Sequence, residues 1–327
     1  MTSVAGRVAA TAGAFAAAGV AGAAATILNK RKTEQRRLQR GEEIAFGTVR
    51  GDSYYVSAAD DVPIHVEVDE GPAPTVVFVH GWMCDLDTWH FQRLALRDQA
   101  RLVFMEQRSH GRSGRSGPRN SSLHDMADDL RRVLDAHAAE GPVVIVGHSM
   151  GGMAVMQLAQ LDPELFDDRV KGVVLISTSA GQLMRRSPGL RFVVPLVKAA
   201  SPLLDWGREF NSYSIIRRWA FGAHAQPAIV DMADEMILRA PTAVVLNFYD
   251  NFVELDLGAG LGAISRCRTS VVCGTKDVMT PFSHSRWLAR HIAGAELVPV
   301  NDAGHMVMLE EHEQVTEAIE RVLKDIA

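Results

Sequence analysis

The chain has 327 residues, of which 47% are hydrophobic and 22% charged, and its formal net charge is −5. This composition excludes an intrinsically disordered protein, and the length is sufficient for one large domain or two small ones. Three scattered cysteines exclude a disulfide framework, and the lack of any C-x-x-C pair disfavours a thiolate zinc site.

The charge is unevenly distributed along the chain. Residues 1–40 carry seven basic residues and one acidic residue, a net +6, which leaves −11 on the remainder. A nucleic-acid-binding domain would carry a positive patch on its folded body, so this acidic body disfavours a nucleic-acid partner.

The first predicted element is the uncharged stretch of residues 8–28, which is followed by the basic cluster Lys30–Arg40. Its length would just span the hydrocarbon core of a bilayer as a helix. Three interpretations stay open: a membrane anchor that leaves the following domain cytoplasmic, a cleaved secretory signal, and a tail without a membrane role. The anchor is favoured. A stripe of small residues would also permit homo-oligomers through helix pairing. It consists of Ala10, Ala14, Ala18 and Gly22.

Residues 41–327 read as a single α/β domain. Phe46–Val56 and Val62–Val68 alternate polar and apolar residues, which predicts a leading hairpin. Continuous β-branched runs, typical of buried parallel strands, follow at Thr75–Val79, Leu102–Met105, Val143–Val146, Gly172–Ile176, Ser270–Cys273 and Glu296–Val300. Helical spacing is seen in Ser122–Ala139, Met153–Leu161 and Val315–Ile326. This alternation predicts a mostly parallel, doubly wound sheet.

One interval breaks the alternation. Residues 181–257 hold no strong strand run and read as short helices separated by prolines. We expect a helical cap inserted over the carboxyl edge of the sheet, where open α/β sheets bind ligands. Three of its apolar side chains, Phe192, Trp206 and Phe248, are tentative substrate contacts.

The chemical motif follows the run Val143–Val146. Gly147, Ser149 and Gly151 form G-x-S-x-G in a strand–turn–helix context. Such a turn holds the serine in a strained conformation that exposes its hydroxyl, and it leaves no room for a Cβ at either flanking glycine. The helix that begins near Met150 directs its free N–H groups at this hydroxyl. The pattern therefore predicts a nucleophilic serine.

A serine hydroxyl needs a base to accept its proton. His305 lies on the loop after the last predicted strand and would reach the same sheet edge as Ser149. His148 adjoins the serine, but we expect its side chain to point away along the turn. His305 is therefore the predicted base.

The imidazole in turn needs an acid that orients it. Asp277 follows the predicted strand Ser270–Cys273 and is the favoured acid; Asp302, three residues before the histidine, is the alternative. The backbone N–H groups of Trp82 and Met150 are the predicted oxyanion donors. Both side chains are also tentative substrate contacts.

These residues resemble the α/β-hydrolase superfamily over residues 46–327. The resemblance rests on the His80-Gly81-Trp82 loop, Glu106–Ser113, the Gly147–Gly152 turn, Gly274–Pro281, Gly304-His305, and the order serine, acid, histidine. The second of these segments usually begins with Asp in that family, where this chain has Glu106; the segment is structural there. The string Gly-His-Ser-Met-Gly-Gly is similar to that of monoacylglycerol lipases and microbial carboxylesterases.

The resulting hypothesis is a serine esterase for a small-molecule ester with a hydrophobic acyl or alcohol part. The same three side chains would also serve carbon–carbon bond, thioester or lactone hydrolysis, or perhydrolysis, and a hydrolase-like binding module without turnover is a further alternative. No cofactor or metal is expected, because the sequence lacks G-x-G-x-x-G after a strand and H-E-x-x-H. The acidic stretches Asp231–Glu235 and Glu310–Glu313 are interpreted as solvated helix faces.

Overall fold

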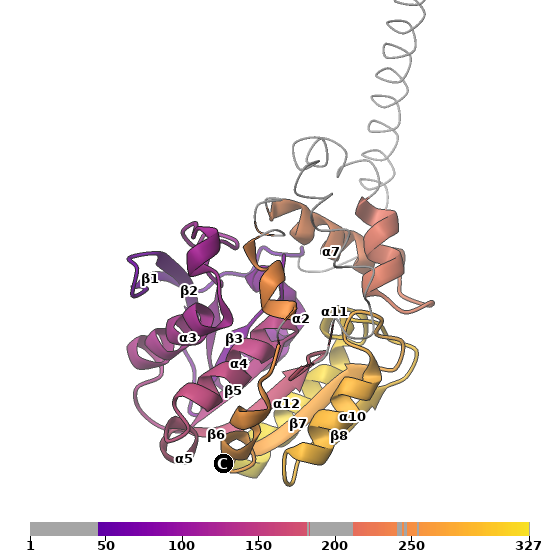
Figure 1. Ribbon diagram of the computed structural model, residues 1–327. Helices are drawn as coiled ribbons and strands as arrows, with labels where there is room; N and C mark the ends of the chain where they lie inside the picture. Colours follow the sequence, from indigo (N-terminus) through magenta and orange to yellow (C-terminus); the bar gives the residue numbers. More distant parts are fainter. Residues whose placement is uncertain are drawn as a thin grey trace, which may run out of the picture.

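A computed structural model describes residues 45–181, 183, 212–240, 244, 247–253 and 255–326. These residues are organised by an eight-stranded sheet with the order β1-β2-β4-β3-β5-β6-β7-β8 (Figure 1). β2 pairs antiparallel with β1 and β4, and all the other pairs are parallel. The mostly parallel sheet predicted from the sequence is confirmed. The strands are β1 (Asp52–Ser57), β2 (Pro63–Asp69), β3 (Thr75–Val79), β4 (Arg101–Met105), β5 (Val143–His148), β6 (Val170–Ile176), β7 (Arg268–Gly274) and β8 (Glu296–Val300).

The leading strand begins later than predicted. The alternating pattern starts at Phe46, whereas β1 begins at Asp52. The chain turns at residues 46–47, where Thr48 N donates to Ala45 O and Gly47 has a φ of +72°, a conformation that ends an extended run. Local turn chemistry therefore overrides the alternating pattern.

Helices cover both faces of the sheet (Figure 1). The α-helices are α2 (His90–Leu96), α3 (Leu123–His137), α4 (Met150–Leu161), α5 (Leu165–Asp168), α7 (Pro227–Arg239), α9 (Leu261–Ile264), α10 (Phe282–His291), α11 (Val307–Glu310) and α12 (His312–Ile326). Short 3₁₀ helices are η1 (Leu86–Trp89), η2 (Pro118–Asn120), η4 (Tyr249–Phe252) and η5 (Gly258–Gly260). Ser122 and Asp125 form a capping box at the start of α3, which explains why that helix begins where its sequence pattern begins.

The central strands are buried on both faces, as their unbroken apolar runs predict. In β3, Val77 and Val79 belong to the core formed with α3, α4 and α10. The intervening Val76 and Phe78 belong to the core formed with α2 and α12. The two-residue period of the strand thus supplies two cores and leaves the carboxyl ends of the strands to carry polar groups.

The interval 181–257 is helical in the parts that are described. Residues 212–220 form a helix and are followed by α7 and η4. Figure 1 shows α7 beyond one end of the sheet. Across the described ranges, no helix is both long and apolar enough to cross a bilayer. The predicted apolar segment 8–28, its basic cluster and its small-residue stripe lie outside these ranges.

Candidate active site

The loop between β5 and α4 has the strained geometry that its motif predicts. Ser149 has φ +51° and ψ −116°, and its N–H donates to Ile176 O at 2.9 Å. A Cβ on Gly147 would lie 2.8 Å from Gly152 Cα, and one on Gly151 would lie 2.2 Å from Val79 O. Neither backbone neighbour can yield to such an overlap, so both flanking glycines are required.

Ser149 and His305 line one cavity of about 470 Å³. Most of its wall is apolar and comes from elements far apart in the sequence. Ile215 and Trp219 come from the helix 212–220, Ile237 comes from α7, and Met279 comes from the loop after β7. This combination of a few polar groups in an apolar cavity is typical of small-molecule sites.

Asp277 holds the imidazole of His305. The distance from Asp277 Oδ2 to His305 Nδ1 is 2.9 Å, and both side chains are buried. The same carboxylate accepts hydrogen bonds from the N–H of Met279 and from the N–H and Oγ1–H of Thr280. Burial raises the pKa of Asp277, but the charge and hydrogen bond of His305, together with those bonds from Thr280, hold it below its usual value. The acid is therefore ionised and can orient Nδ1–H, which leaves Nε2 to act on substrate.

The alternative acid is not in contact with the imidazole. The Asp302 side chain is 65% exposed, and its partner is Lys276 at 3.8 Å. Asp302 has a φ of +60° and its N–H donates to Thr275 Oγ1, so it serves the turn. The structure thus brings Asp277 to His305 and leaves Asp302 at the surface.

His148 does not point away from the cavity as expected. It lines the cavity, its ring centroid is 4.8 Å from that of His305, and its Nε2 lies 3.2 Å from His305 O. Because a carbonyl only accepts, Nε2 carries the hydrogen, and burial and then His305 lower the pKa of His148 well below its usual value. A Cβ on Gly81 would come within 2.6 Å of His148 Nδ1. The absent side chain at Gly81 is therefore what allows the ring to turn inward.

The predicted oxyanion donors, Met150 and Trp82, lie at the start of α4 and on the loop after β3, which meet near Ser149. Met150 is the first residue of α4, so its N–H has no acceptor within the helix. The loop after β3 carries Trp82, and a Cβ on the preceding Gly81 would lie 3.2 Å from Ser149 Cβ. The Trp82 side chain lines the cavity and donates to Val244 O, whereas the Met150 side chain is fully buried in the core.

The loop that carries Trp82 is fixed by two buried histidines. His80 Nε2 accepts from Gln107 N at 3.1 Å, and His110 Nε2 accepts from Met83 N at the same distance. Burial lowers the pKa of His80 to about 4 and that of His110 to about 3, so both rings stay neutral and can accept. Their role is structural, as the family resemblance implied for the segment Glu106–Ser113 that contains His110.

The predicted substrate contacts separate into three groups. Trp82 lines the cavity. Phe248 is fully buried, and its ring packs against that of His110 at 5.2 Å. Phe192 and Trp206 lie outside the described residues. Ile215 also lines the cavity but is not among the predicted substrate contacts. Its four-residue spacing from Trp219 places both on one face of a helix and could have indicated it.

Two acidic residues, Glu310 and Asp231, do not lie on solvated helix faces as expected. The carboxylate of Glu310 accepts from Gly304 N at 2.8 Å and from Gly222 N at 3.1 Å, and burial raises its pKa. It thereby ties the loop of His305 to the chain that follows the helix 212–220. Asp231 is also buried, against expectation. No local pattern distinguishes such carboxylates from exposed ones, because their partners lie far away in the sequence.

An ion-pair network attaches α7 to η1, which follows the loop that carries Trp82. Arg239, the last residue of α7, contacts Asp85 Oδ2 at 2.8 Å and Asp87 Oδ2 at 2.5 Å, while Arg50 contacts Asp87 Oδ1 at 2.6 Å. Burial and then Asp87 raise the pKa of Asp85 to about 7. The cavity wall formed by α7 is therefore held by two buried acidic side chains that pair with partly exposed guanidinium groups. Within the described residues, no group of three or more His, Cys, Asp or Glu side chains is arranged to hold a metal.

Fold and sequence together define the class. The model of the alpha/beta hydrolase family matches residues 76–318, and the chain belongs to this family. The AB hydrolase superfamily protein YisY of Bacillus subtilis (strain 168) is 27% identical over 280 residues, which are 81% of this chain and 97% of that protein.

Solved structures agree with this membership. A thermophilic esterase from Thermogutta terrifontis, with malate bound, has a TM-score of 0.71 and 25% identity, and the match covers 84% of this chain and 99% of that one. Est816, described as an N-acyl homoserine lactone degrading enzyme, has a TM-score of 0.66 and 28% identity, with coverages of 82% and 99%. The chain therefore has an esterase-type hydrolase fold.

Proposed function

We propose that the protein is a serine hydrolase that cleaves carboxylic esters through an acyl-enzyme on Ser149. One observation carries the proposal: a serine in a strained strand–helix turn shares a cavity with a histidine that is hydrogen-bonded to a buried carboxylate. This combination supplies a nucleophile, a base and an orienting acid. A serine that is merely hydrogen-bonded to a histidine would lack the orienting acid.

In the proposed reaction, His305 Nε2 takes the Ser149 proton as Oγ bonds to the ester carbonyl carbon. The N–H groups of Trp82 and Met150 stabilise the oxyanion that forms. Collapse of this intermediate breaks the bond to the alcohol, which leaves with the proton from His305. Water then gives a proton to His305 and attacks the acyl carbon, and the carboxylic acid is released as the proton returns to Ser149.

The apolar cavity favours a hydrophobic acyl or alcohol part. We propose that residues 181–257 act as a cap, because the helix 212–220 and α7 contribute much of the lining. Trp219→Ala removes a large apolar contact and should raise KM for p-nitrophenyl laurate about tenfold while sparing the acetate ester. Equal effects on both esters would contradict the acyl-pocket assignment.

The decisive test is labelling with a fluorophosphonate, followed by peptide mass spectrometry. We expect a single adduct on Ser149 and loss of esterase activity in proportion to labelling. A folded protein that resists the probe would instead favour a binding module without turnover.

A second candidate reaction is lactone opening, which uses the same three side chains. It is supported by the similarity to Est816, whose description names an N-acyl homoserine lactone degrading enzyme. A panel of p-nitrophenyl esters, thioesters and lactones, compared by kcat/KM, distinguishes the candidates. Carbon–carbon hydrolysis and perhydrolysis are tested by the same panel when a diketone and hydrogen peroxide are added.

We also propose that residues 8–28 and their basic cluster associate with a membrane, on the basis of their uncharged length and flanking charges. Removing residues 1–40 should then move the protein from the membrane pellet to the supernatant without loss of activity on a soluble ester. Equal partitioning of both forms would dismiss this proposal.

A further inference from the structure

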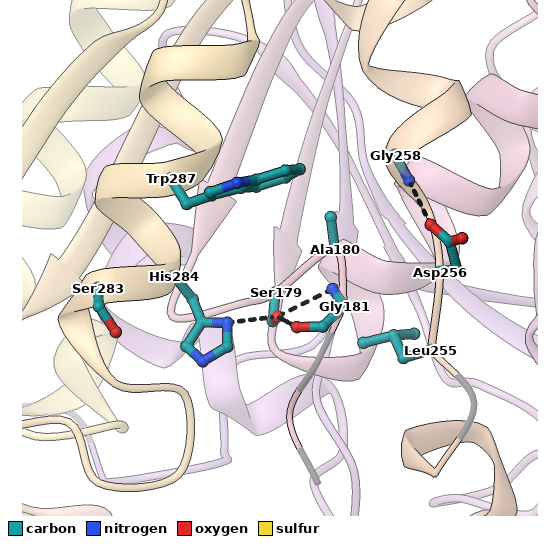
Figure 2. Close-up of a pocket in the computed structure, with 9 residues that line it drawn as sticks. All are labelled: Ser179, Ala180, Gly181, Leu255, Asp256, Gly258, Ser283, His284 and Trp287. Carbon is teal, nitrogen blue, oxygen red and sulfur yellow. Dashed lines mark hydrogen bonds between the residues drawn. The ribbon is translucent and has the colours of Figure 1, made fainter. Parts of the chain in front are cut away.

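A second cavity, of about 290 Å³, lies beside the carboxyl ends of β6 and β7 (Figure 2). Its walls are the loop after β6, the chain that leads into η5, and α10. It shares no lining residue with the cavity of Ser149 and His305. The proposed hydrolysis therefore leaves it without a role.

The walls of this cavity are joined to one another. Gly181 and Asp256 form an antiparallel bridge, and Leu257 N donates to Ala180 O at 2.8 Å. The hydroxyl of Ser179 lies 2.9 Å from His284 Nδ1 on α10, a contact that Figure 2 shows together with the bond to Gly181. The cavity is thus preformed, so a ligand would not have to order it on binding.

An indole ring forms one wall. Trp287 is 42% exposed, and one of its faces stacks on His291, with ring centroids 3.9 Å apart and planes inclined by 20°. Nδ1–H of His291 also donates to Trp287 O at 2.8 Å, so this arrangement is fixed. Figure 2 shows the indole extending from α10 toward Ala180. A large aromatic side chain held at the wall of a cavity offers its remaining face to a ligand.

The opposite wall carries a carboxylate. Asp256 is exposed, and its Oδ1 accepts a long bond of 3.4 Å from Gly258 N. Among the described residues, no Lys or Arg lines this cavity, and Asp256 is the only Asp or Glu that does. A carboxylate and an aromatic face that border the same small space attract a cation by Coulomb and cation–π interactions together.

We propose that this cavity binds a small organic cation, an alkylated ammonium, between Asp256 and Trp287. Its alkyl groups would contact Ala180 and Leu255, which supply the apolar part of the wall. The site is separate from the proposed hydrolytic centre and does not depend on it.

The test is a calorimetric titration of the full chain with choline and with 3,3-dimethylbutan-1-ol, which has nearly the same shape but no charge. We expect saturable choline binding that is at least about tenfold tighter than binding of the neutral alcohol, since a desolvated cation–π contact alone is worth about that factor. Equal binding of the two compounds, or no choline binding, would overturn the proposal.

Variants locate the site. Asp256→Asn and Trp287→Leu should each weaken choline binding about tenfold, and both residues are exposed enough for folding to persist, which circular dichroism checks. Asp302→Asn and Trp219→Leu are matched controls, an exposed acid and an exposed tryptophan elsewhere. Loss of choline binding in Trp219→Leu but not in Trp287→Leu would place the ligand in the other cavity and refute the proposal. Ser149→Ala should still bind choline, so failure of the hydrolytic proposal would not be mistaken for failure of this one.

Discussion

Two cavities at the same edge of the sheet each contain a serine and a histidine. Ser149 and His305 follow β5 and β8, whereas Ser179 follows β6 and His284 lies on α10. Ser179 Oγ lies within hydrogen-bond distance of a histidine nitrogen, 2.9 Å from His284 Nδ1. Judged by that distance alone, it would be the better candidate for a nucleophile.

The difference between the two serines lies in what surrounds each hydroxyl. Ser179 Oγ also bonds to Gly181 O and Gly181 N, so its hydroxyl is engaged in a local turn. Ser149 has a positive φ and lies at the N-terminus of α4, where free N–H groups can stabilise developing negative charge. Backbone strain and electrostatic setting, rather than distance to an imidazole, therefore support Ser149 as the proposed nucleophile.

The sharpest test of this comparison is to remove each hydroxyl in turn. Ser149→Ala should lower kcat for ester hydrolysis on the order of 10⁴-fold or more, because no acyl-enzyme can form. Ser179→Ala should change kcat less than about threefold. Steady-state kinetics with p-nitrophenyl butyrate measures both, and the reverse order of effects would show that the wrong serine has been identified.

The orienting acid is the second point of difference. Asp277→Asn should lower kcat about 10³- to 10⁴-fold, because the amide no longer holds the required tautomer of His305. Asp302→Asn is the control, since its carboxylate is exposed and contacts Lys276. A large loss of activity in the control alone would transfer the role of the acid to Asp302.

The residue before Ser149 should have a smaller effect. His148→Phe keeps the ring but removes the donor to His305 O, so we expect about a tenfold fall in kcat with KM unchanged. His148→Asn can restore a donor and should recover part of the loss. Because His148 stays neutral, the acidic limb of the wild-type pH profile should show a single ionisation. Two ionisations in that limb, or no recovery of kcat in His148→Asn, would contradict a role for His148 in positioning the backbone of His305.

The smallest expected effect is on stability and concerns Asp85, the partner of Arg239 at the end of α7. Burial and the neighbouring Asp87 raise the pKa of Asp85 to about 7 from 3.8, so the folded protein binds this proton more tightly than the unfolded chain does. The Asp85 contribution to the free energy of unfolding therefore falls as pH rises from about 4 to 7. Asp85→Asn lacks this titration while its amide oxygen can still accept from Arg239. The melting temperature of Asp85→Asn, measured relative to that of the wild type, should therefore rise as pH increases across that window. A difference that stays constant with pH would contradict this expectation.

Much of the architecture was predictable from the sequence because its signals are local. β3 and β8 have the predicted bounds, since each strand-like run is followed directly by turn residues. α4 begins at Met150, as the strand–turn–helix motif predicts, although regular helical spacing is seen in the sequence only from Met153, because the glycines after Ser149 hide the pattern. The juxtaposition of Asp277 and His305 was expected from the carboxyl ends of parallel strands, which lie at one edge of the sheet.

What the sequence did not reveal depends on distant partners. His148 turns inward because Gly81, remote in sequence, leaves room for its ring. Arg239 reaches Asp85 and Asp87 across more than a hundred residues, and Glu310 reaches Gly222 across 88. Such pairings produce no periodic pattern in the sequence, and the residues next to them give no indication of the distant partner.

The order of the strands has a consequence for biosynthesis. Among the described strands, β8 comes last in chain order and lies at the edge of the sheet, and the loop that follows it carries His305. Contacts between this loop and the turn at Ser149 join residues far apart in the chain, such as His148 and His305, which are separated by 157 positions. Such long-range contacts slow folding. A nascent polypeptide that has already formed the turn at Ser149 thus lacks its proposed proton acceptor until β8 and the loop after it have been translated. On the proposed mechanism, the hydrolase is inert on the ribosome and becomes active only when its sheet is complete.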